Sequence, residues 1–141
     1  MENFLLIIFG VAGLLAVLAV VMMVVFKKKV VRFSPEKYSQ LSTKISQMIN
    51  SDDINLQRQA VVEADKLLDA ILKTKVSGKD LGARLIAAQK IINNRQVYSD
   101  AWEAHKLRNK LVHDVHVEIS SGQCKQAVSS FRRVFNVLGY K

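Results

Sequence analysis

The residues best suited to acid–base and phosphate chemistry cluster in one stretch, residues 101–116. This stretch holds all three histidines and the only tryptophan. On a helix that advances about 100° per residue, a polar and aromatic stripe forms along one side. Its members are Trp102, His105, Asn109, His113 and His116. Because histidine titrates near neutral pH, this stripe could supply a general acid or base.

Arg108 belongs instead to the neighbouring apolar face of the same predicted helix. The other members of that face are Ala101, Ala104, Leu107, Leu111, Val112 and Val115. A buried arginine is costly unless a carboxylate, a carbonyl or a phosphate pairs with it. Arg108 therefore either reaches solvent, bridges to a carboxylate such as Asp69 or Asp114, or binds the phosphate of a substrate.

The spacing of Arg108-Asn109 and His113 resembles the motif of the HEPN family of small helical domains. In that motif an arginine, usually with a polar residue next to it, precedes a histidine by four to six positions. A wider match covers about residues 53–138. It rests on Leu67-Leu68-Asp69, Gly78-Lys79-Asp80-Leu81-Gly82-x-Arg84-Leu85, Trp102-x2-His105-x2-Arg108-Asn109-x3-His113 and Phe131. This order resembles small bacterial proteins that have one N-terminal span before a HEPN-like domain. This second resemblance implies a fold but no established activity.

The resemblance to HEPN ribonucleases implies that two copies pair and that RNA is cut in their shared cleft without a metal. It implies His113 as general acid or base, Arg108 as a clamp on the transition-state phosphate, and Asn109 as a positioning group. Auxiliary candidates on the stripe are Trp102, His105 and His116. Many HEPN domains only bind or pair, so a non-catalytic interaction or dimerisation module is the alternative. The partners implied are a second copy, RNA, and an antitoxin or other protein.

The charge of the chain is compatible with a nucleic-acid partner. The formal net charge is +9, and residues 51–141 carry 15 Lys or Arg against 10 Asp or Glu. A phosphate-attracting surface is predicted around the motif, formed by Lys106, Lys110, Arg132 and Arg133. An ordinary solvated surface would have a similar composition, so both interpretations stay open.

The N-terminal segment predicts a membrane anchor. Phe4 to Phe26 comprises 23 residues without a charge, which would extend about 35 Å as a helix and cross a bilayer. A cleaved signal peptide has a basic start and a shorter apolar core, unlike this segment. The residues that follow the apolar segment are basic: Lys27, Lys28, Lys29 and Arg32. By the positive-inside rule, residues 1–3 should lie outside and the C-terminal domain in the cytoplasm of a single-pass inner-membrane protein.

Residues 27–50 form a basic juxtamembrane segment, with six Lys or Arg against one Glu. Such a segment is attracted to anionic lipid headgroups, although it could equally serve only to set topology. Ser34 and Pro35 are typical of a helix start, and Tyr38 and Met48 belong to an apolar face at helical spacing. Whether this helix packs on the membrane or on the domain is left open.

Residues 51–141 predict an all-α domain, a HEPN-like bundle of four to five helices. Helix starts are indicated at Asp53, Leu81 and Ser120, and Gly139 should end the last helix. Asn93-Asn94 separates the helix that starts at Leu81 from the helix that carries Trp102. The predicted core positions are Ala60, Ala64, Leu67, Leu68, Ile71, Leu81, Leu85, Ala88, Ile92, Cys124, Ala127, Val128, Phe131, Phe135 and Leu138. The three histidines do not converge and no cysteine pair exists, so neither a metal site nor a cofactor is predicted. A single cysteine is typical of a reducing compartment.

Overall fold

The computed structural model describes residues 13–18, 20–21, 32–114 and 117–141. The chain divides into two units, Met1–Val30 and Val31–Lys141. Residues 13–18 and 20–21 are helical, whereas the rest of the predicted span and Lys27, Lys28 and Lys29 lie outside the described residues. Within the described part of the chain, no helix is both long enough and apolar enough to cross a membrane.

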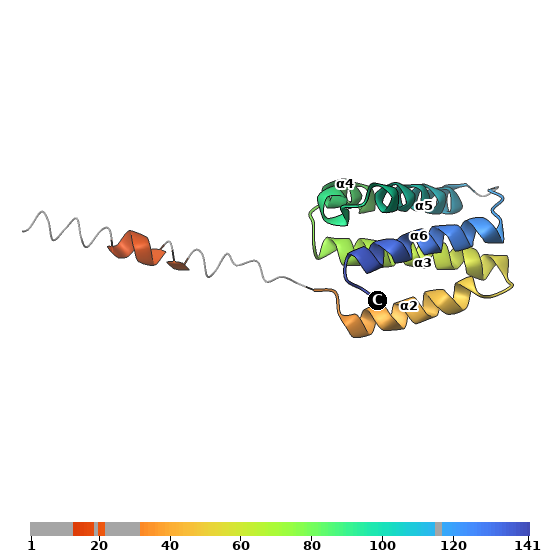
Figure 1. The fold of residues 1–141 in the computed structure, drawn as a ribbon, viewed down its shortest axis with the longest axis horizontal. Helices are drawn as coiled ribbons and strands as arrows, with labels where there is room; N and C mark the ends of the chain where they lie inside the picture. Colours follow the sequence, from red (N-terminus) through yellow and green to blue (C-terminus); the bar gives the residue numbers. More distant parts are fainter. Residues whose placement is uncertain (1–12, 19, 22–31, 115–116) are drawn as a thin grey trace, which may run out of the picture. The chain divides into compact units, whose positions relative to one another are not determined.

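The second unit is a bundle of helices, which confirms the all-α prediction for the described residues. In chain order, the helices are α2 (Pro35–Ile49), α3 (Ile54–Lys73), α4 (Leu81–Ile92), α5 (Arg95–His113) and α6 (Ser121–Val137). Helices α3 and α6 occupy the middle of this unit, with α2 on one side and α4 and α5 on the other (Figure 1). The middle helix α3 packs against every other helix of the bundle, so it is the element against which the site is built.

Local capping interactions define the helix starts. The side chains of Ser34, Asp53, Asp80 and Asn94 each accept a hydrogen bond from a backbone N–H in the first turn of the helix that follows. Ser120 and Gln123 form the predicted capping box at the start of α6. Each cap accepts a hydrogen bond from a backbone N–H that has no partner within the helix, and each contributes about 1 kcal/mol to the free energy of unfolding.

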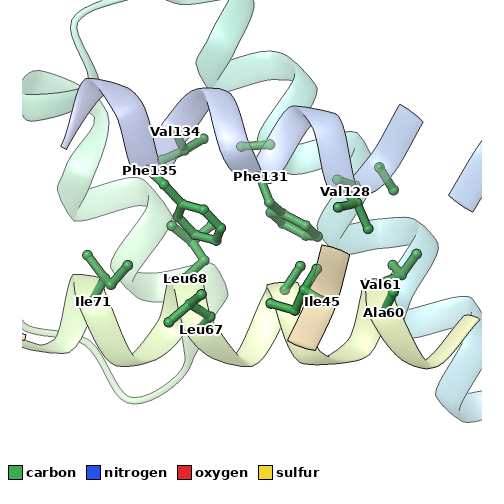
Figure 2. Close-up of a cluster of buried hydrophobic side chains, with 14 of the residues drawn as sticks. Ile45, Ala60, Val61, Leu67, Leu68, Ile71, Val128, Phe131, Val134 and Phe135 are labelled. Atoms are coloured by element: carbon green, nitrogen blue, oxygen red, sulfur yellow. The ribbon is translucent and has the colours of Figure 1, made fainter. Parts of the chain in front are cut away.

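The core confirms the predicted apolar faces of α3, α4 and α6. Phe131 and Phe135 of α6 and Leu68 and Ile71 of α3 belong to one buried cluster between the two helices (Figure 2). All four side chains are at most 2% exposed. Burying each of them contributes about 1.5–3 kcal/mol relative to leaving it in water. Leu138, predicted for the same face, is only partly buried.

Helix α2 belongs to this core, which resolves the alternative that the sequence left open. Tyr38, Ile45, Met48 and Ile49 are buried, and the helix packs against α3 and α6. The compact unit therefore starts near Val31, whereas the sequence placed the start of the domain at residue 51.

The helix that carries the motif starts after Asn93-Asn94, as predicted, but ends before the predicted His116. It begins at Arg95 and ends at His113, with Asp114 as C-cap, whereas residues 115–116 lie outside the described part of the chain. Ala101 and Ala104 are buried as predicted. Val112, predicted for the same apolar face, is 50% exposed, whereas Leu107 and Leu111 of that face are partly buried against the core.

Candidate functional site

The polar stripe of α5 faces α3 over part of its length. His105 and Asn109 lie one turn apart and are both partly buried, and both His105 and Arg108 reach Asp65 of α3. His113, one turn beyond Asn109, is exposed at the end of the helix. Within one chain, the structure thus brings together Arg108, Asn109 and His105, but it does not place His113 with them.

A closed ring of four polar side chains forms the centre of the site. His105 Nδ1 lies 2.7 Å from Asp65 Oδ1, and His105 Nε2 lies 3.2 Å from Asn109 Nδ2. Arg108 Nη1 donates to Asn109 Oδ1 at 3.0 Å. Arg108 Nε lies 3.2 Å from Asp65 Oδ2, which completes the ring as an ion pair. When His105 Nδ1–H donates to Asp65, His105 Nε2 accepts from the Asn109 amide, so both ring nitrogens are engaged.

The pair between Arg108 and Asp65 is electrostatic rather than a well-aligned hydrogen bond. Arg108 Nε is buried and has no hydrogen-bond partner despite its 3.2 Å separation from Asp65 Oδ2. An ion pair needs only proximity, whereas a hydrogen bond also requires the N–H to point at the acceptor. This contact is therefore the one link of the ring that is an ion pair without a hydrogen bond.

Asp65 is the site residue that sequence reasoning missed. Its side chain is only 5% exposed, and it supplies the carboxylate that the sequence assigned to Asp69 or Asp114. Asp69 pairs instead with Arg84 of α4 at 2.5 Å. A signal was present, because Asp65 falls between Val61 and Leu68 on the buried face of α3, where an acid needs a partner.

A cleft of about 680 Å³ opens beside the ring, between α3, the start of α4 and α5. Five cationic and three acidic side chains line it, which leaves a positive excess. The cationic residues are Lys66, Lys73, Lys79, Arg84 and Arg108. Among the described ion pairs, Lys73 and Lys79 take no part, whereas Lys66 pairs with Glu63 at 3.0 Å. The cleft can therefore attract an anion such as a phosphodiester.

Trp102 packs beside this cleft without lining it. Its ring contacts that of His105 at a centroid distance of 6.0 Å, and its edge lies over Gly82 at the start of α4. A Cβ at Gly82 would lie 3.6 Å from the indole, which is an ordinary van der Waals contact, so the packing of Trp102 against α4 does not require glycine at this position. The tryptophan thus supports the position of His105 by packing.

The predicted phosphate-attracting residues do not line the cleft. Lys106 pairs with Glu103 at 2.8 Å, and Lys110 is exposed on α5. The two arginines lie on α6: Arg132 donates to Ser46 Oγ at 2.7 Å, and Arg133 pairs with Asp100 at 2.8 Å. The basic residues that do line the cleft come from α3, α4, α5 and the turn between α3 and α4.

The remaining predicted residues lie elsewhere. His116 is outside the described residues, and Arg32 is exposed in the segment before α2. In the described ranges, no three His, Cys, Asp or Glu side chains are grouped so that they could hold a metal ion. Cys124 is fully buried in the core, and this burial raises the pKa of its thiol despite the opposing charge of Arg58.

Comparison of the chain with protein-family models, with curated proteins and with solved structures finds no match. The likeness to HEPN domains therefore rests on the motif residues themselves and stays a prediction.

Proposed function

We propose that this chain is a membrane-anchored, HEPN-like module that binds RNA in the cleft beside α5 and, as a homodimer, cleaves it without a metal. The observation that carries the proposal is the cleft itself, which is open, polar and lined by an excess of cations. Arg108 and Asn109 of the motif line it together. A phosphodiester is the ligand whose charge and hydrogen-bond acceptors match such a lining.

Apart from Lys66, which pairs with Glu63, the cations of the cleft divide into two groups with different roles. Lys73 and Lys79 are exposed and form no ion pair among the described residues, so their charges are available to RNA. Arg84 and Arg108 are held by Asp69 and Asp65. We expect the lysines to attract the backbone in a salt-dependent manner and the fixed arginines to orient it.

His113 is the residue best suited to move a proton. It is exposed, whereas both ring nitrogens of His105 already have partners. Along an ideal helix, His113 is about 7.5 Å and about 140° away from Arg108, so one phosphate would not meet both from the same copy. A second copy that brings its α5 across the cleft would place a histidine opposite the arginine. The proposal therefore includes a homodimer.

The membrane part of the proposal rests on the sequence. The uncharged run Phe4–Phe26 precedes Lys27, Lys28 and Lys29, an arrangement typical of a single span with a cytoplasmic C-terminal side. RNA is available on that side of the inner membrane. An antitoxin or another protein would be the natural regulator of such an activity.

The test uses the full chain, purified in a nonionic detergent and incubated with labelled single-stranded RNA in EDTA. We expect cleavage by the wild type and by Lys90→Ala, an exposed change on α4 outside the cleft. Cleavage should be lost in His113→Ala, which removes an exposed side chain and leaves the core intact. Equal cleavage by wild type and His113→Ala would refute the proposed role of His113, and no cleavage by the wild type would refute the nuclease.

A non-catalytic interaction module is the second candidate, and the closed ring favours it. The ring engages Asp65, His105, Arg108 and Asn109 with one another, as a purely structural network would. This candidate predicts a folded dimer without RNA cleavage, and a lower melting temperature for Arg108→Ala. RNA binding that disappears in a Lys73→Gln, Lys79→Gln double variant would favour the first candidate instead.

A further inference from the structure

A second cavity, of about 520 Å³, lies where the chain enters and leaves the bundle. Its walls come from the segment before α2, from α2 itself, from the turn after α3 and from the C-terminal residues after α6. We call it the end cavity; the residues that matter here are Arg32, Phe33, Tyr38, Lys75 and Tyr140. All of them belong to the second unit of the chain. It takes no part in the cleft beside α5.

The C-terminal residues are fixed in place by a defined helix end. Gly139 has φ +88°, and its N–H donates to the Asn136 carbonyl at 3.1 Å. The Tyr140 N–H donates to the Phe135 carbonyl at 2.9 Å, which completes a Schellman motif. The chain therefore turns back over α2, where the Tyr140 ring lies 5.2 Å from that of Tyr38.

The end cavity combines aromatic rings with cations. Lys75 Nζ lies 5.6 Å from the Tyr140 ring centroid. Outside the lining, Lys37 Nζ lies 5.7 Å from the ring centroid of Phe33. Arg32 and Lys141 also line the cavity, and no Asp or Glu side chain does so among the described residues. Tyr140 Oη donates to the Phe33 carbonyl at 3.4 Å, so the two aromatic walls are tied together.

Cations beside aromatic rings are the residue types that proteins place at the level of lipid headgroups. The ammonium and guanidinium groups can bind a lipid phosphate, while the rings contact the boundary between headgroups and acyl chains. The apolar run that ends at Phe26 precedes Arg32 by six residues. Six residues extend at most about 20 Å, so with the run in a bilayer the cavity stays within reach of the headgroups.

We infer that the end cavity binds the headgroup of an anionic phospholipid, with Lys75 and Arg32 at the phosphate and Tyr140 and Phe33 beside it. This inference rests on the membrane anchor of the proposed function but not on RNA binding or cleavage. The sequence predicts lipid contact only for the basic segment 27–50. The inferred site adds Lys75 and Tyr140, which lie far from that segment in the sequence.

The experiment reconstitutes the full chain into lipid nanodiscs and measures amine labelling by mass spectrometry. One set of discs contains phosphatidylcholine only, and the other also contains phosphatidylglycerol. We expect labelling of Lys75 to slow about fivefold in the anionic discs, as for one lysine in contact with an anionic surface. Lys90, which is exposed on α4, should label at the same rate in both.

Two variants test whether the cavity itself is responsible. Tyr140→Ala removes an aromatic wall, and Arg32→Gln removes an exposed cation without disturbing the core. Each should restore fast labelling of Lys75 in anionic discs, with the fold checked by circular dichroism. Protection that persists in both variants would indicate a diffuse surface potential and overturn the inference.

The remaining outcomes also bear on the inference. Equal protection in both types of disc would overturn it, as would protection that inorganic phosphate alone reproduces in phosphatidylcholine discs. Protection that grows with the number of chains per disc would overturn it too, by assigning the cavity to a second copy. A chain that does not enter discs at all would refute the anchor and this inference together, whereas RNA cleavage tests the rest of the proposed function separately.

Discussion

Replacing Asp65 by asparagine removes the negative charge from the ring while keeping its shape. The new side chain would still offer one oxygen to His105, but it would present an amide to the guanidinium of Arg108. Losing one partner of a buried ion pair costs about 3–5 kcal/mol. Arg108 has 24% of its side chain exposed, so water can replace part of the interaction. We therefore expect a loss of about 2–3 kcal/mol, which lowers the melting temperature of a domain of this size by about 10 °C.

The assay is thermal and urea unfolding of the full chain, followed by circular dichroism, with Asp100→Asn as the matched control. Asp100 pairs with Arg133 at 2.8 Å, but the two side chains are 24% and 46% exposed. This surface pair should contribute less than about 1 kcal/mol. An equal or smaller loss for Asp65→Asn than for Asp100→Asn would refute the importance of the ring. Additive effects of Asp65→Asn and Arg108→Gln would show that the two side chains are not coupled.

Three other variants probe the fold. His113→Ala should leave the melting temperature within about 1 °C of wild type, because the side chain is exposed, and a larger drop by circular dichroism would show a structural role. Ser120→Ala should cost about 1 kcal/mol in urea unfolding, since it removes the capping box of α6. Burial raises the pKa of the Cys124 thiol above its ordinary value of 9.0. As the pH rises, the thiol therefore ionises first in the unfolded chain. Its contribution to the free energy of unfolding is fully present below pH 9 and is lost as the pH rises above that value. A Cys124→Ala variant that loses stability equally steeply above pH 9 would contradict the reasoning.

The helix boundaries could be predicted because their determinants are local. Asp53, Asp80 and Ser120 each cap the helix that starts one residue later, and the apolar spacing on α3, α4 and α6 indicated which faces are buried. These signals need only neighbours within four or five residues. The C-terminal end of α5 was harder to predict, because the helix stops at Asp114 in an extended conformation without a glycine or proline to mark the end.

The partner of Arg108 could not be predicted because it depends on how α3 and α5 pack. The stripe on α5 indicated that Arg108 needs a partner, and the sequence offered several acids. Asp65 and Asp69 are one turn apart on α3, so a choice between them requires the register of one helix against the other. The same limit applies to α2, because its apolar face would fit a membrane surface as well as α3.

The ring limits how Arg108 can bind a ligand, because the guanidinium already pairs with Asp65 within the same chain. A phosphate that binds Arg108 would compete with Asp65, or would bind the guanidinium edge that Asp65 leaves free. Lys73 and Lys79 have no such competitor among the described ion pairs, so the proposed attraction of RNA would depend mainly on them. Removing the two lysines should weaken RNA binding without changing stability, whereas removing Arg108 should change stability first. The two kinds of variant therefore distinguish a site that binds RNA from a network that only holds α5 against α3.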